Sequence, residues 1–144
     1  MTNYRRNYPA GGIYFFTVAI AERRLDLLVQ HIQHLKASLR DEQQRAPFYN
    51  LAFVVLPDHL HAVWRLPRND SDYSSRWRRI KAGFSRSIPP GEPVSSSRKA
   101  RGERGVWQRR FWEHTVRDEE DLQRHLDYVH FNPVKDGLIS RVSD

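Results

Sequence analysis

Residues Leu51 to Leu66 read LAFVVLPDHLHAVWRL. A mostly apolar run leads into Pro57-Asp58 and an alternating run leads out, which predicts two antiparallel strands joined by a tight turn. Successive side chains on a strand point to opposite faces, so His59 and His61 are expected side by side on one face. Two neutral imidazoles held in this way suit a divalent metal ion, although His-x-His pairs also occur in strands without one.

The chain around this segment follows a strand-helix-strand-strand-helix-strand pattern with one further helix. Strands are predicted over Ile13–Ile20, Phe48–Leu56, His59–Leu66 and Val106–Val116. Helices are predicted over Leu25–Gln44, Ser75–Ser87 and about Asp118–Asn132. This order predicts a ferredoxin-like α+β sandwich, an antiparallel sheet of four to five strands with helices packed on it. We expect residues 1–144 to form one domain, with a basic loop over about 88–105.

The composition narrows the chemistry. The chain has 24 Lys and Arg residues against 17 Asp and Glu, a net charge of +7, which favours a polyanionic partner such as nucleic acid. It has no cysteine, which excludes disulfides, zinc–thiolate sites, iron–sulfur clusters and thiol nucleophiles. Histidine, carboxylate and amide ligands remain, and they suit magnesium, manganese or zinc. Because no segment resembles a signal peptide or a membrane span, we expect a cytoplasmic protein with no membrane partner.

Basic and aromatic residues occur together near the N-terminus, in the predicted helix 75–87 and in the predicted strand 106–116. Cationic side chains bind phosphates, and aromatic rings stack on bases. The candidate DNA-binding residues are Arg5, Arg6, Arg76, Arg78, Lys81, Arg109 and Arg110. A frayed terminus, a solvated helix face and tryptophans that fill the core would give the same pattern, so both interpretations stay open at this point.

The last predicted helix offers two further groups. Tyr128 and Asn132 are four residues apart, so they share one side of that helix. Asn132 could add an oxygen ligand to His59 and His61, and Tyr128 could act as a nucleophile. A phenol with a pKa of about 10 is a poor nucleophile at neutral pH unless its target is activated. A metal ion on the scissile phosphate would activate it, and attack by Tyr128 would leave a covalent phosphotyrosine.

With these residues in place, the chain resembles the REP-associated tyrosine transposases, within the HUH single-strand nucleases. The similar segments are YRRNYPAGGIYFFTV (4–18), FVVLPDHLHAVWRLP (53–67), SSRWRRIKAGF (74–84) and WQRRFWEHTVRDEEDLQRHLDYVHFNPVKDGL (107–138). The resemblance implies that His59, His61 and Asn132 bind Mg²⁺ or Mn²⁺ and that Tyr128 is the nucleophile. It implies a 5′-phosphotyrosine intermediate, a free 3′-OH, and single-stranded palindromic repeats that fold into hairpins as substrates. It also implies a monomer with Tyr128 acting in cis, or a dimer that exchanges the last helix.

Three functions therefore compete. The favoured one is a metal-dependent single-stranded DNA endonuclease and strand transferase acting on hairpin repeats. A non-catalytic single-stranded nucleic-acid-binding module on a ferredoxin-like sheet would use the same aromatics and arginines, with His59 and His61 as ordinary sheet residues. A hydrolytic metal site that activates water would cleave DNA without a covalent adduct. The position of Tyr128 relative to the histidine pair distinguishes the enzyme from the binding module, because a binding module has no need of a tyrosine beside the two histidines.

Overall fold

The computed structural model of the protein describes residues 11–89 and 105–135, and for 132–135 it describes the backbone only. Arg5, Arg6 and most of the predicted basic loop lie outside these residues. In chain order the elements are β1 (Ile13–Ala19), α1 (Leu27–Gln30), α2 (Ile32–Arg45), β2 (Tyr49–Val55), β3 (His59–Arg65), α3 (Tyr73–Ser87), β4 (Trp112–Thr115) and α5 (Glu119–Lys135). Among the described helices, none is long and apolar enough to cross a membrane.

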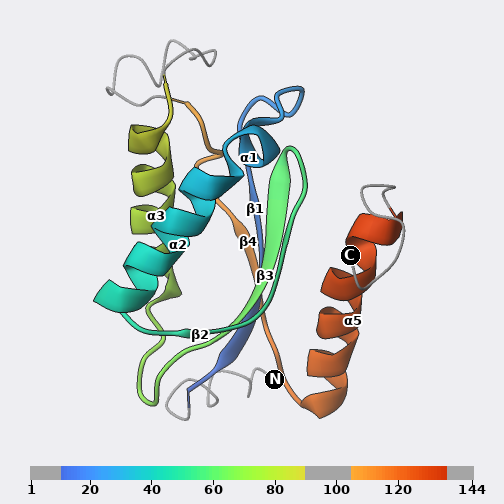
Figure 1. The fold of residues 1–144 in the computed structure, drawn as a ribbon. Helices are drawn as coiled ribbons and strands as arrows, with labels where there is room; N and C mark the ends of the chain where they lie inside the picture. The colour runs from blue at the N-terminus through green and yellow to red at the C-terminus, as the bar shows by residue number, and fades with distance from the viewer. Residues whose placement is uncertain (1–10, 90–104, 136–144) are drawn as a thin grey trace.

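The four strands form one antiparallel sheet in the order β2-β3-β1-β4. The predicted hairpin and the ferredoxin-like class are confirmed. Helices α2 and α3 cover one face of the sheet and α5 covers the other (Figure 1). The register places His61 opposite Thr17, and Thr17 opposite Trp112. These three residues form one row across β3, β1 and β4, on the face that α5 covers.

Each face of the sheet has its own apolar core. On the side of α2 and α3, Trp64 and Trp77 are fully buried and their rings stack 4.4 Å apart at 10°. On the other side, Phe15 and Val63 pack against Val129 of α5. Burial on both faces explains why the β1 sequence is an almost continuous apolar run without polar alternation. The second core fixes α5 over the row that contains His61.

The first predicted helix is divided in two. His31 has φ −116° and ψ 39°, which ends α1 and lets α2 begin at Ile32. The short α1 contacts the turn that precedes β3, where the Leu28 N–H donates to the Pro57 carbonyl at 3.4 Å. Helix α3 begins at Tyr73, two residues before the predicted start. Its N-cap is Asp72, whose carboxylate accepts from the Ser75 N–H at 3.0 Å.

The last strand and the last helix also differ from their predicted lengths. Of the predicted strand 106–116 only Trp112–Thr115 pairs continuously, with an isolated bridge from Trp107 to Ile20 before it. Residues 106–108 are still hydrogen-bonded to the end of β1, because the Gln108 N–H donates to the Ala19 carbonyl and the Ala21 N–H donates to the Val106 carbonyl, both at 2.9 Å. The Lys81 ammonium of α3 donates to the Gln108 carbonyl, also at 2.9 Å. Helix α5 is described as far as Lys135, three residues beyond the prediction, and it continues through Pro133.

Candidate active site and DNA-binding surface

His59 and His61 lie next to each other on β3, with ring centroids 4.9 Å apart and planes at 79°. His61 is buried and His59 is half-buried. The Nδ1 atom of His59 lies 2.7 Å from Asp58 Oδ1, and that of His61 lies 2.9 Å from Thr17 Oγ1. Metal-binding histidines characteristically have one ring nitrogen held by such a partner, which fixes the ring and the tautomer for coordination through the other. The two imidazoles therefore fit a metal centre.

Asp58 orients His59 and is itself held by a second group. The Arg23 Nε–H donates to Asp58 Oδ2 at 2.6 Å. Partial burial favours the neutral acid, but the hydrogen bonds from His59 and Arg23 outweigh it and lower the pKa of the Asp58 carboxyl. The carboxylate is thus ionised at neutral pH and accepts from His59. Sequence analysis interpreted Pro57-Asp58 only as a turn and missed this role, although the carboxylate directly precedes a candidate ligand.

The structure brings Tyr128 to the histidine pair. Its ring centroid lies 5.1 Å from that of His61, with planes at 70°, and its side chain is about half exposed. Both residues line a pocket of about 410 Å³ on the α5 face of the sheet. We call it the tyrosine pocket, and its lining residues are Phe15, Thr17, His61, Trp112, Arg124, His125 and Tyr128. Asn132 follows one turn later in α5, and its side chain lies outside the described residues.

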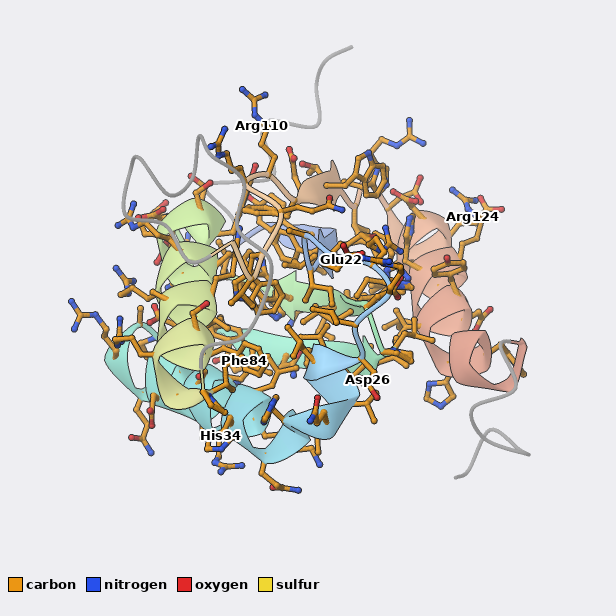
Figure 2. The ribbon with its side chains drawn as sticks, turned by 90° about the horizontal axis from the view of Figure 1, so that it is seen from above. Glu22, Asp26, His34, Phe84, Arg110 and Arg124 are labelled. Carbon is orange, nitrogen blue, oxygen red and sulfur yellow. The ribbon has the colours of Figure 1, made fainter. Side chains whose placement is uncertain are left out.

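Arg124 is a further side chain of this pocket that sequence analysis missed. It precedes Tyr128 by four residues, so the two share one side of α5. Its side chain is 58% exposed, and one guanidinium nitrogen lies 3.3 Å from Asp121 Oδ1. Figure 2 shows Arg124 at the outer surface of α5. A cation at this position adds positive charge beside the histidine pair. The helical spacing from the tyrosine was the available signal.

The first turn of α5 is attached to the sheet through Asp121, which is buried. Its carboxylate accepts from the Arg117 N–H and pairs with His114 Nε2, both at 2.9 Å. Burial opposes ionisation, but these two hydrogen bonds prevail and lower the pKa of the Asp121 carboxyl. His114 also stacks on His125 at 4.6 Å, and His125 lies 4.8 Å from Phe15. These contacts fix the helix that carries Tyr128.

The same cluster has metal-ligand chemistry. Ligand atoms of His114, Asp121 and His125 lie within 4.8 Å of one another, close enough to share an ion. The Asp121 carboxylate is already surrounded by donors, including the guanidinium of Arg124 at 3.3 Å. A cation next to a carboxylate weakens the attraction of that carboxylate for a metal ion. The group is a possible His-Asp-His metal site, distinct from His59 and His61.

The interpretation of Arg76 as a DNA contact is wrong. Its side chain is 4% exposed and donates to both oxygens of Asp70, at 2.8 and 3.2 Å. It also donates to the carbonyls of Ala46 and Pro47, each at 2.9 Å, and to that of Asp72 at 3.0 Å. A guanidinium buried among these acceptors joins the start of α3 to the end of α2. It has no exposed surface to offer a phosphate.

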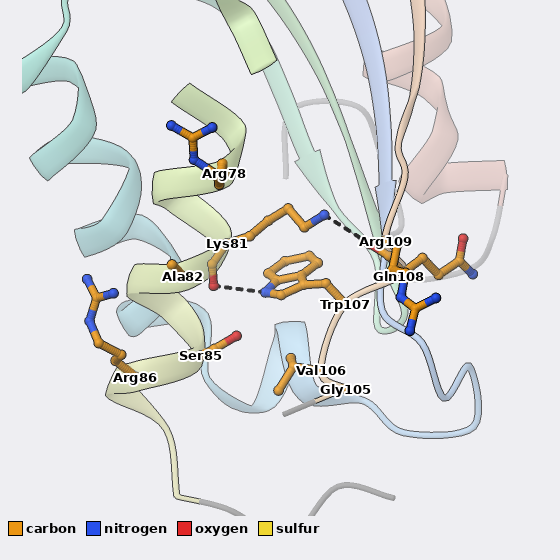
Figure 3. A pocket seen from close by; sticks show the side chains of 10 residues that line it. All are labelled: Arg78, Lys81, Ala82, Ser85, Arg86, Gly105, Val106, Trp107, Gln108 and Arg109. Atoms are coloured by element: carbon orange, nitrogen blue, oxygen red, sulfur yellow. Dashed lines mark hydrogen bonds between the residues drawn. The ribbon is translucent and has the colours of Figure 1, made fainter. Parts of the chain in front are cut away.

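Three other predicted contacts share one basic pocket. Arg78, Lys81 and Arg109 line a hollow of about 470 Å³ between α3 and residues 105–109, together with Arg86 (Figure 3). We call it the α3 pocket. Trp107 lies between its walls, almost fully buried, and its indole N–H donates to the Lys81 carbonyl at 3.1 Å. Trp107 therefore fills the core. Arg110 is exposed and points away from the molecule (Figure 2).

No protein-family model matches the sequence, but individual known proteins do. The chain is 42% identical over its whole length to the REP-associated tyrosine transposase of Escherichia coli, of which it covers 79%. It is 40% identical to a Haemophilus influenzae protein that bears the same family name, of which it covers 82%. A solved REP-associated tyrosine transposase bound to a REP hairpin matches with a TM-score of 0.78 at 42% identity, over 100% of this chain and 79% of that one. The chain belongs to the REP-associated tyrosine transposases.

Proposed function

We propose that this protein cleaves and rejoins single-stranded DNA at hairpin repeats of the REP type, with Tyr128 as the nucleophile. The observation that carries the proposal is the position of the Tyr128 ring, 5.1 Å from the His61 ring and within one pocket. The α5 helix packs on the sheet of its own chain, which is the arrangement that Tyr128 acting in cis requires. A relative of known structure binds a REP hairpin, which supports the choice of substrate.

We further propose that His59, His61 and Asn132 hold Mg²⁺ or Mn²⁺. The donor set fits such an ion, because Asp58 and Thr17 hold the Nδ1 atoms of the two imidazoles and an amide oxygen suits hard cations. When bound, the ion would withdraw charge from a non-bridging oxygen of the scissile phosphate. Asp58 keeps His59 in the tautomer that leaves Nε2 available for the ion, and the packing of Val129 on Phe15 and Val63 holds α5 on the face that carries His61.

In the proposed step the Tyr128 phenol loses its proton to solvent and its oxygen attacks the phosphorus in line. The new bond joins phosphorus to the tyrosine oxygen, and the bond from phosphorus to the 3′ oxygen breaks. The leaving 3′ oxygen takes up a proton, so the products are a 5′-phosphotyrosine and a free 3′-OH. Because one phosphoester replaces another, the bond energy is retained and the strand can be rejoined. The exposure of Tyr128 allows a DNA strand to reach it.

The α3 pocket supplies a second part of the proposal, the binding of the DNA backbone. Arg78, Lys81 and Arg109 converge there from two segments that are distant in sequence. Several cations gathered around one hollow suit consecutive phosphates, which dominate the affinity of proteins for DNA. Helix α3 and helix α5 lie on opposite faces of the sheet (Figure 1). Binding and cleavage are therefore assigned to different residues and can be separated by mutation.

The proposal is tested with a REP hairpin oligonucleotide that has single-stranded flanks, incubated with the protein and Mg²⁺ or Mn²⁺. We expect a protein–DNA adduct that survives denaturing electrophoresis. Tyr128→Phe and His61→Ala should form no adduct while they still bind the hairpin. Tyr49→Phe is the matched control, because Tyr49 is an exposed tyrosine on the far edge of the sheet. Tight binding without an adduct under either metal would favour the binding module, and cleavage without an adduct would favour a hydrolytic site.

A further inference from the structure

Trp112 differs from the other tryptophans of the chain. Its side chain is 56% exposed, whereas Trp64, Trp77 and Trp107 are at most 6% exposed. All four tryptophans lie within the described residues, so the contrast covers every tryptophan of the sequence. A large apolar ring left in water contributes nothing to the core, and exposed aromatic residues beside polar groups commonly mark binding sites. Trp112 is therefore available for a ligand.

Trp112 lies close to the residues that are proposed to cleave DNA. It stands in the same cross-strand row as His61, with Thr17 between them. Adjacent strands are about 4.8 Å apart, so the backbones of Trp112 and His61 are separated by roughly 10 Å. Trp112 also lines the tyrosine pocket, together with Tyr128 and Arg124. This separation is comparable to the span of one nucleotide from its phosphate to its base.

The indole is held in place before any ligand arrives. The Phe15 ring meets it edge-on at 5.9 Å and 72°, and the His114 ring lies nearly parallel to it at 6.1 Å and 5°. β4 is an edge strand that pairs only with β1 among the described strands, so a flexible strand can approach from its open side. Arg124 adds a mostly exposed cation at the same pocket. A fixed ring beside a cation suits a nucleobase followed by its phosphate.

We propose that Trp112 binds a base of the single-stranded DNA next to the scissile phosphate by stacking, and so positions the strand for Tyr128. The inference rests on the proposed function and adds a binding residue that acts on the single-stranded flank of the hairpin. Stacking accepts every base, so Trp112 positions the strand without reading its sequence. The net charge of +7 favours a polyanion as the occupant of this pocket over an apolar protein segment.

Intrinsic fluorescence tests the contact directly. Because the other tryptophans are buried, quenching by acrylamide reports mainly on Trp112. In a Tyr128→Phe background, which prevents cleavage, a REP hairpin with single-stranded thymidine flanks should reduce this quenching. A blunt hairpin without flanks should not, and the flank effect should be absent when Trp112→Phe is added. The inference is overturned if the effect persists in Trp112→Phe, or if Trp112 is already shielded in the free protein and DNA changes nothing.

Affinity provides the second measurement. Trp112→Ala should weaken binding of the flanked hairpin by about 5- to 150-fold, the range found for loss of one stacked base, and Trp112→Phe should restore most of it. Affinity for the blunt hairpin should not change. Tyr49→Ala, at an exposed aromatic residue on the opposite edge strand, is the matched control. Equal affinity of Trp112→Ala and its parent for the flanked hairpin would overturn the inference. The proposed function fails separately, by the absence of an adduct with the unmodified protein.

Discussion

Asp58 fixes the orientation and the tautomer of the His59 ring, and these determine how His59 binds a metal ion. Its carboxylate accepts from His59 Nδ1 at 2.7 Å and is kept ionised by Arg23. Loss of such a partner typically lowers metal affinity by about 10- to 100-fold. We expect Asp58→Asn to bind Mn²⁺ that much more weakly in calorimetric titrations. The control is Asp41→Asn, at an exposed carboxylate on α2, and an unchanged affinity of Asp58→Asn would refute the role of Asp58.

Single residues also show what sequence can and cannot predict. The pair His59 and His61 is evident from strand alternation, because both side chains share one face wherever that strand lies. The contact of Thr17 with His61 cannot be predicted from strand alternation, because it joins residues 44 positions apart and depends on the register of two strands. Arg76 looked like its basic neighbours on α3. Only the position of the carbonyls of Ala46 and Pro47 determines that it is buried.

Helix α5 depends on Asp121 for its attachment to β4. The lowered pKa of this carboxyl stabilises the folded state above the unfolded-state pKa of about 3.9, and this contribution disappears as the pH falls through the lower folded-state pKa. We expect Asp121→Asn to reduce the free energy of unfolding at pH 7 by about 1–3 kcal/mol. In urea titrations the difference from the parent should narrow as the solution is acidified. Asp127→Asn, at an exposed carboxylate on α5, should have little effect, and a difference for Asp121→Asn that stays constant with pH would contradict this account.

Helix α3 carries two arginines with opposite expected effects. Arg76→Ala leaves the Asp70 carboxylate and three carbonyls without their donor, so it should cost about 3 kcal/mol or more of folding free energy. Arg78 is exposed, so Arg78→Ala should change stability by less than about 0.5 kcal/mol and weaken DNA binding. Thermal unfolding and fluorescence anisotropy with the hairpin measure the two effects. A stable Arg76→Ala with selectively weakened DNA binding would reverse the assignment.

The elements themselves were largely predictable, and their ends were not. Apolar residues three and four apart identified α5, and Leu122, Leu126 and Val129 do pack on the sheet. The break at His31 was not predicted, because the apolar spacing of three and four residues continues across it, whereas the backbone at His31 has φ −116° and ψ 39°. The shortened β4 was not predicted either, because the apolar and aromatic pattern runs on from Trp107 to Trp112, whereas continuous pairing with β1 begins only at Trp112. Local sequence patterns thus predict that an element exists better than they predict where it stops.

At the scale of the whole molecule, positive charge should govern the affinity of the protein for DNA. Removal of a cation that binds one phosphate reduces the slope of log K against log salt concentration by about 0.7 for a single strand and about 0.9 for a duplex. Arg78→Ala and Arg109→Ala should each reduce the slope by about this amount, and the double variant by about twice as much. Arg40→Ala, on the exposed side of α2, is the control. Anisotropy titrations at several salt concentrations give the slope, and a slope equal to that of the parent would exclude the α3 pocket as a backbone-binding site.

The sheet has an apolar core on each face, and this arrangement places Tyr128 beside the histidines. The continuous apolar sequence of β1 predicts a strand buried on both sides, and the split β-α-β order predicts which strands are central. Which helix lies on which face does not follow from either pattern. Of the helices that the structure describes, α5 alone covers the face that carries His61, so the tyrosine of the last described helix lies beside a histidine of the third strand.

The most direct test of the role of Tyr128 is to locate the covalent bond between the protein and DNA. The protein is incubated with a flanked REP hairpin and Mn²⁺, digested with trypsin, and the DNA-linked peptide is identified by mass spectrometry. We expect the peptide from His125 to Lys135, in which Tyr128 is the only tyrosine, joined to the 5′ phosphate of the fragment downstream of the cleavage site. Attachment at a different tyrosine, or cleaved DNA with no peptide attached, would contradict the account.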